Sequence, residues 1–162
     1  MKKVGIVMGS QSDRPIVEKA VQRLKEFGVP VQVRVLSANR TPEETATFAR
    51  GAREAGFGVL IAAAGKAAAL PGAVAACTTL PVIGLPIQGS FMDGLDSLLS
   101  MVQMPSGIPV ATVAVNGSDN AALLAISILS VEDQYLAEKL DKYREKMAQD
   151  VLEADRRTKE EL

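Results

Sequence analysis

The chain carries five short apolar runs, and each is followed by a polar loop and a segment with helical spacing of its apolar residues. The runs cover residues 4–8, 31–36, 58–63, 81–85 and 110–115. The first run is an unbroken Val/Ile stretch, which is typical of a strand covered on both faces of a parallel sheet, whereas residues 31–36 alternate and are rich in Val, as a strand often does. The helical segments are residues 16–27, 42–55, a short one through Cys77, 95–102 and 120–129. This alternation predicts an α/β fold with three layers and a doubly wound parallel sheet of about five strands.

The last part of the chain, residues 131–162, has a helical pattern but is much more charged. Its apolar residues form a narrow stripe, which consists of Tyr135, Leu136, Leu140, Tyr143, Met147 and Val151. Since the earlier helices already cover the sheet, we expect this stripe to contact another subunit. The pattern predicts an α/β domain over residues 1–130 and a C-terminal helical extension, residues 131–162, that packs on neighbouring subunits of a homo-oligomer.

Composition narrows the range of partners. The 162 residues are 48% hydrophobic, enough for one sizeable core, and the formal net charge is −1. The nearly balanced charge gives no strong electrostatic field that would attract nucleic acid or an anionic membrane. The longest apolar stretch, residues 59–64, is too short to span a bilayer. The single cysteine, Cys77, is expected as inert packing on an apolar helix face. With no secretory leader in the sequence, we expect a cytoplasmic protein.

The chain contains neither histidine nor tryptophan. The lack of histidine excludes a Ser-His-Asp triad, a Cys-His pair and any metal site built from imidazole. The mechanisms that depend on these three arrangements are therefore ruled out.

The loop after the first run, residues 9–13, holds Ser10, Ser12 and Asp13 between a strand and the next helix. Free backbone N–H groups and the helix dipole favour an anion such as phosphate at this position. The alternative is that Ser12 or Asp13 only caps the helix, with Pro15 in its first turn.

The loop after the second run also crowds polar residues at the start of a helix. Ser37, Asn39 and Arg40 precede Thr41 and Pro42, which resemble a helix cap and a first helical position. Arg40 offers a forked, permanently charged donor suited to phosphate, although an isolated arginine is more often a solvated surface charge. In a doubly wound sheet the ligand lies outside the carboxyl ends of the strands, so both loops are expected at one edge.

Six ordered motifs then resemble one family over essentially the whole chain. They are residues 8–13 (MGSQSD), 37–42 (SANRTP), 70–72 (LPG), 94–98 (GLDSL), 102–105 (VQMP) and 120–125 (NAALLA). In combination they resemble the class I N5-carboxyaminoimidazole ribonucleotide mutases of purine biosynthesis, relatives of the aminoimidazole ribonucleotide carboxylases. The resemblance implies a flavodoxin-like, cofactor-free isomerase without metal, commonly an octamer. Such an enzyme moves a carboxyl group from the exocyclic amine to the ring carbon of an aminoimidazole ribonucleotide.

The resemblance also assigns roles to loop residues. In similar proteins the positions of Ser10, Ser12 and Arg40 hold the phosphate, and that of Asp13 binds the ribose hydroxyls. Ser37 is expected to line the same pocket. From the third loop, Gly65 and Leu70 are expected to contact the substrate.

The chain departs from the family pattern where chemistry is expected. Asn39 stands where the family has a histidine thought to exchange the proton at the ring carbon, and Ala69 replaces a second histidine. An amide does not titrate near neutral pH, whereas a positioned acid or base contributes about 100- to 10,000-fold in rate. Ala63 and Lys66 replace two family glycines in the third loop. The mutase activity is therefore expected to be impaired or altered.

Lys66 leaves several interpretations open. If it points inward, it can bind a carboxylate or phosphate, or act as an acid, a base or a carbonyl-trapping amine. If it points outward, it meets solvent or an adjacent subunit. Three functions remain: an impaired mutase, a diverged carboxyl-transfer or decarboxylation enzyme that uses Lys66, and a non-catalytic ribonucleotide-binding oligomer or engineered scaffold.

Overall fold

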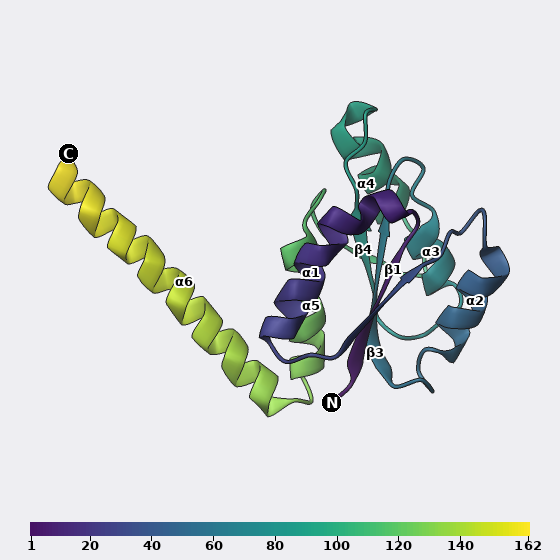
Figure 1. The fold of residues 1–162 in the computed structure, drawn as a ribbon, viewed down its shortest axis with the longest axis horizontal. Coiled ribbons are helices and arrows are strands. Elements are labelled where there is room, and N and C mark those ends of the chain that lie inside the picture. The colour runs from purple at the N-terminus through teal and green to yellow at the C-terminus, as the bar shows by residue number, and fades with distance from the viewer.

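The computed structural model describes all of residues 1–162 and has one parallel sheet between two layers of helices, with a long helix leading away from them (Figure 1). The strands are β1 (Lys3–Met8), β2 (Val31–Val35), β3 (Phe57–Ala64), β4 (Val82–Pro86) and β5 (Ala111–Thr112). The helices are α1 (Arg14–Glu26), α2 (Pro42–Gly51), α3 (Leu70–Ala75), α4 (Leu95–Val102), α5 (Ser118–Ser130) and α6 (Gln134–Glu161), with short 3₁₀ turns η1 (Gln11–Asp13) and η2 (Met92–Gly94). The strand order is β2-β1-β3-β4-β5, and every pair is parallel. The predicted flavodoxin-like fold is confirmed.

The sheet separates two hydrophobic cores. On one side α1, α5 and the start of α6 pack on strand residues that include Ile6 and Ile61. On the other side α2, α3 and α4 pack on residues that include Val7 and Leu60. Successive strand residues point to opposite faces, so the neighbours Ile6 and Val7 are both buried, which explains the unbroken apolar run of β1. The edge strand β2 is mostly exposed, in keeping with its alternating sequence.

Three boundaries differ from the sequence prediction. The fifth strand was expected over residues 110–115, but β5 has only the two residues Ala111–Thr112, and the chain reaches a turn at Asn116, which has a left-handed φ of 57°. Helix α2 ends at Gly51 and not near residue 55, because residues 52–55 form turns that lead into Gly56 at a φ of 87°. Helix α3 ends at Ala75, so Cys77 lies in the following turn and is partly exposed, not on a helix face as predicted.

Helix α6 packs on the rest of the chain mainly along residues 134–143, as far as Tyr143, whose ring contacts that of Phe27. The Asp133 side chain accepts a hydrogen bond from the backbone N–H of Leu136 at 3.2 Å, so the helix starts at Gln134, after a break at residues 131–133. Leu136 is fully buried, whereas Val151 is 69% exposed. Figure 1 shows the outer part of α6 extending away from the sheet and its helices. The predicted stripe therefore packs at its root and is open further out, and no helix is both long and apolar enough to cross a membrane.

Candidate functional site

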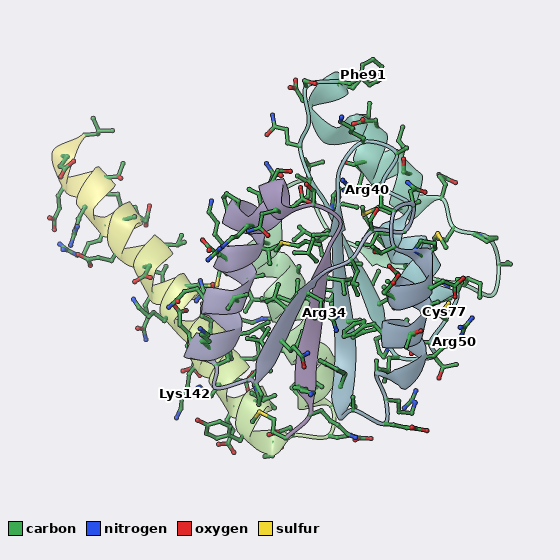
Figure 2. All side chains as sticks on the ribbon, turned by 45° about the vertical axis from the view of Figure 1, so that its right-hand side comes forward. Arg34, Arg40, Arg50, Cys77, Phe91 and Lys142 are labelled. Atoms are coloured by element: carbon green, nitrogen blue, oxygen red, sulfur yellow. The ribbon has the colours of Figure 1, made fainter.

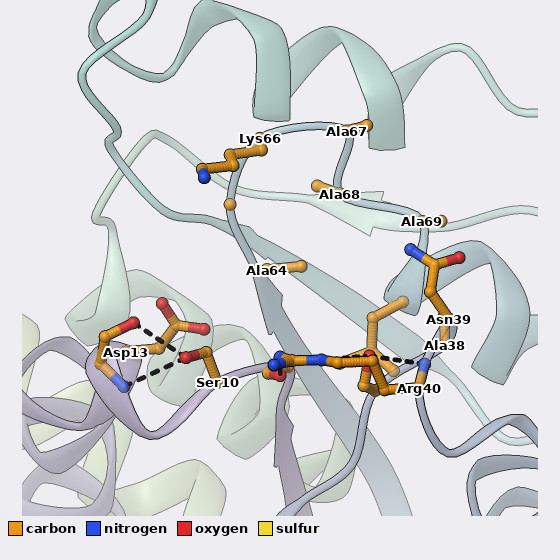
Figure 3. A pocket seen from close by; sticks show the side chains of 15 residues that line it. Ser10, Asp13, Ala38, Asn39, Arg40, Ala64, Lys66, Ala67, Ala68 and Ala69 are labelled. Atoms are coloured by element: carbon orange, nitrogen blue, oxygen red, sulfur yellow. Dashed lines mark hydrogen bonds between the residues drawn. The ribbon is translucent and has the colours of Figure 1, made fainter.

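The loops after β1, β2 and β3 meet in one cavity of about 630 Å³ at the carboxyl edge of the sheet (Figure 3). They meet because β1 lies between β2 and β3, so the three strands end side by side. We call residues 9–13 the first loop, residues 37–41 the second loop and residues 64–70 the third loop. The residues that line the cavity are Gly9, Ser10, Ser12, Asp13, Ser37, Ala38, Asn39, Arg40, Ala64, Gly65, Lys66, Ala67, Ala68, Ala69 and Leu70. All of the site residues expected from the sequence are among them.

In the first loop Ser10, and not Ser12 or Asp13, caps the turn. Its Oγ accepts a hydrogen bond from the Ser12 backbone N–H at 3.4 Å and from the Ser12 hydroxyl at 3.0 Å. Asp13 makes no capping bond with its side chain, although Pro15 lies in the first turn of α1 as expected. The capping alternative was thus wrong about which residue is involved, and the Asp13 carboxyl makes no capping bond.

Asp13 is the buried acid of the cavity, with 8% of its surface exposed. Burial raises the pKa of its carboxyl above the ordinary value, and a hydrogen bond with the Ser10 backbone partly opposes the rise. Ionising the carboxyl in this buried position therefore costs free energy. A ligand that donates hydrogen bonds to it, such as a sugar diol, would lower that cost.

The second loop is held rigidly by hydrogen bonds around Ser37. The Ser37 N–H donates to Thr41 Oγ1 at 2.8 Å, and the Thr45 hydroxyl donates to the Ser37 carbonyl at 3.2 Å. Thr41 occupies the cap position of α2 but makes no capping bond from its side chain, while Pro42 begins the helix as predicted. Ser37 Oγ accepts from the Arg40 N–H at 3.1 Å, so this loop presents Arg40 in a defined position.

Arg40 joins the first and second loops. Its Nη2 donates to the Gly9 carbonyl at 2.9 Å, and its Nε lies 3.5 Å from Ser37 Oγ. Figure 3 shows the guanidinium lying across the floor of the pocket. Nη1 has no partner among the hydrogen bonds of this side chain, so part of the planar fork faces the cavity and can bind an oxyanion.

Asn39 and Ala69 lie on the same side of the cavity. Both are exposed, and Figure 3 shows the Asn39 amide pointing toward the third loop, where Ala69 lies. Neither side chain titrates, so neither can carry a proton to or from a bound molecule near neutral pH.

The third loop is mostly small and apolar. Gly65 and the exposed Ala67 border the cavity, while Leu70 is 2% exposed and forms part of the wall. Lys66 is the exception: it is exposed, and its backbone adopts a left-handed φ of 55°. Its ammonium group extends along the rim toward the side of the site that contains Asp13 (Figure 3).

Sequence reasoning missed the contribution of the backbone and of the small residues. The carbonyl of Gly9 is the acceptor that fixes Arg40, and Ala38, Ala64 and Ala68 shape the wall. The available signal was that small residues directly follow three apolar runs, which leaves backbone groups accessible at each strand end. Nowhere in the chain, the cavity included, is a group of three or more His, Cys, Asp or Glu side chains placed to hold a metal ion.

Comparison with known proteins gives a consistent result. The family described as AIR carboxylase matches residues 3–150. An N5-carboxyaminoimidazole ribonucleotide mutase of Pyrococcus abyssi is 56% identical over 147 residues, which are 91% of this chain and 84% of that protein. One of Thermotoga maritima is 50% identical over 157 residues, 97% and 92% of the two chains. The crystal structure of Treponema denticola PurE superposes with a TM-score of 0.85 at 34% identity, covering 94% of this chain and 95% of that one.

Proposed function

Starting from the fact that this chain belongs to the AIR carboxylase family, we propose that its three-loop cavity binds carboxyaminoimidazole ribonucleotide and supports a slow form of the mutase reaction of purine biosynthesis. The observation that carries the proposal is the position of Arg40. It is tied to the Gly9 carbonyl in the one cavity that also contains Ser10 and Ser12. A forked cation held beside two hydroxyls is a suitable site for a phosphate dianion.

In this proposal each wall binds a different part of the substrate. Arg40, Ser10 and Ser12 bind the phosphate, and Ser37 keeps Arg40 in place. The Asp13 carboxylate accepts hydrogen bonds from the ribose hydroxyls. The imidazole ring then reaches the third loop, where Gly65 and Leu70 offer backbone and apolar contact.

The reaction requires a proton to leave the ring carbon once the new carbon–carbon bond has formed. The chain has no histidine. Asn39 and Ala69 line the pocket at the two positions where the family pattern has a histidine. Asn39 can orient the substrate by hydrogen bonding, but it cannot accept the proton. We therefore expect binding that is close to that of an active enzyme, together with a much lower turnover.

We further propose that the chain assembles as a homo-oligomer, an octamer by family resemblance, in which residues 131–162 pack on neighbouring subunits. The outer half of α6 exposes apolar residues, and so does the segment through η2 and α4, where Phe91 is at the tip (Figure 2). Exposed apolar area of this kind marks protein contacts. Sedimentation velocity of the full chain tests this proposal, and a monomer at micromolar concentration contradicts it.

Isothermal titration with carboxyaminoimidazole ribonucleotide tests the proposed substrate. We expect saturable binding, accompanied by slow exchange of the ring-carbon proton of the carboxyl-free aminoimidazole ribonucleotide, followed by proton NMR in deuterated buffer. No binding at millimolar ligand would disprove the proposed function. If the ligand binds but the ring proton exchanges no faster than in buffer, the proposed ligand would stand and the chain would be assigned a non-catalytic role.

A further inference from the structure

The pocket contains a second cation, Lys66, on a different loop from Arg40. Figure 3 shows the two side chains in different parts of the pocket, with Lys66 at the rim and Arg40 on the floor. None of the ion pairs of the chain includes Lys66. The one buried carboxyl that lines the cavity, Asp13, belongs to the first loop.

The backbone at Lys66 is in a conformation that lysine adopts rarely. A φ of 55° places it in the left-handed region, where a residue with a Cβ is disfavoured and glycine is not. Lysine at this position therefore contributes no backbone stability, and its ammonium has no ionic partner in the chain. What it does contribute is a positive charge at the mouth of a cavity that already contains Arg40.

We propose that Lys66 is a specificity-determining residue, which pairs with a carboxylate at the end of the ligand remote from its phosphate. The inference rests on the proposed function, because it assumes a phosphate at Arg40. It extends that function by naming Lys66 as the residue that selects among phosphorylated ribosides and favours those whose base carries a carboxylate over those whose base carries none.

The chemistry of the two cations suits this division. The fork of Arg40 is fixed by Gly9 and Ser37 and matches the several oxygens of a phosphate. An ammonium on a flexible four-carbon stem is a compact point charge with rotatable donors, so Lys66 can follow a carboxylate on either the exocyclic nitrogen or the ring carbon. The same side chain can thereby bind the carboxyl group both before and after it is transferred.

The test compares three probes with isothermal titration: carboxyaminoimidazole ribonucleotide, aminoimidazole ribonucleotide and ribose 5-phosphate. Lys66→Met removes the charge but keeps a side chain of similar length and the same backbone preference. We expect this variant to bind the carboxylated probe about 10-fold or more weakly than the wild type, as for loss of a charge-assisted hydrogen bond. The other two probes should change by less than about 2-fold, and Lys66→Arg should retain the preference.

The matched control is Lys19→Met, which removes the same charge from the exposed face of α1, outside the cavity. Its affinities for all three probes should equal those of the wild type. A second measurement does not depend on matched folding: the affinity of the carboxylated probe should fall more steeply with added salt in the wild type than in Lys66→Met.

The outcomes separate this inference from the proposed function. Equal losses for all three probes in Lys66→Met, or no loss for any, would overturn the role of Lys66 and leave the phosphate site standing. Failure of the wild type to bind even ribose 5-phosphate and both ribonucleotides would overturn the proposed function and this inference together. Unchanged affinity with a turnover lost in Lys66→Met would assign the amine to proton transfer and also overturn the binding role.

Discussion

The first and second loops are tied to each other by hydrogen bonds, whereas the third loop presents alanines and one lysine that has no ionic partner. Arg40 bonds to the Gly9 carbonyl across the gap between the first two loops, and Ser37 supports it. In the third loop Ala67 and Ala69 are exposed and offer no polar side-chain atom. One side of the cavity thus has a cation held in a fixed position, as the proposed phosphate site requires, whereas the third loop contains neither an imidazole nor a carboxyl group.

This contrast shows that substrate binding and proton transfer depend on different properties. Holding a phosphate requires donors in fixed positions, which the loop hydrogen bonds provide. Moving a proton requires a group whose pKa lies near the working pH, and an amide or a methyl group has none. The two capacities can be changed separately, and the following variants test whether they are separate here.

The largest effect is expected on introducing imidazoles at Asn39 of the second loop and Ala69 of the third loop, which lie on the same side of the cavity. The double variant Asn39→His with Ala69→His should raise turnover of carboxyaminoimidazole ribonucleotide by about 100- to 10,000-fold, the usual contribution of a positioned acid or base. Affinity for the substrate should hardly change, because neither substitution removes Arg40, Ser10 or Ser12. Steady-state kinetics and titration measure the two quantities, and a variant that binds as before but stays inactive would show that the pocket differs more widely.

The next effect concerns the phosphate side. Arg40→Met should weaken binding of ribose 5-phosphate by about 10- to 100-fold, because it removes a charge-assisted contact to the phosphate. The control is Arg50→Met, an exposed arginine of α2 outside the pocket (Figure 2). Titration of both variants checks the prediction. Similar losses in the two would mean that Arg40 acts only through the net charge of the chain.

A smaller effect is expected in the stability of the third loop. Lys66→Gly should raise the free energy of unfolding by about 0.5 kcal/mol, since relief of the left-handed strain exceeds the entropy that glycine adds to the unfolded chain. Lys66→Met should be neutral, because it keeps the Cβ. Urea denaturation monitored by circular dichroism measures both. A destabilised glycine variant would show that the loop conformation is not strained.

The smallest effect is a pH dependence at Asp13. Burial raises the pKa of its carboxyl, so the native state binds a proton more readily than the unfolded chain, and ionisation lowers stability as pH rises through the native pKa. Asp13→Asn keeps the hydrogen-bond acceptor and removes this loss. Its melting temperature should exceed that of the wild type at pH 7, and the difference should shrink below the unfolded pKa of 3.8.

The control for this prediction is Asp141→Asn, which removes an exposed carboxylate of α6. Its difference from the wild type should be flat between the same pH values. An Asp13→Asn difference that grows as the pH falls would contradict the assigned cause.

Much of the site could be predicted because it depends on chain order. In a parallel sheet every strand ends at the same edge, so Ser10, Ser37 and Arg40 were expected together from their places after apolar runs. The part that could not be predicted depends on local backbone geometry. Ser10 caps the turn in place of Ser12 or Asp13 because its extended φ and ψ of −149° and 148° aim its Oγ at the Ser12 N–H.

By itself the sequence determined the alternation of strands and helices, the absence of imidazole and the polar loops at one edge, because these follow from hydrophobic periodicity and residue type. Only the tertiary structure decided that Arg40 reaches across to Gly9, that Lys66 lies on the pocket rim at a positive φ, and that α6 packs on the rest of the chain mainly along residues 134–143. These features depend on contacts between segments far apart in the chain, and no local pattern specifies which neighbour a side chain will meet.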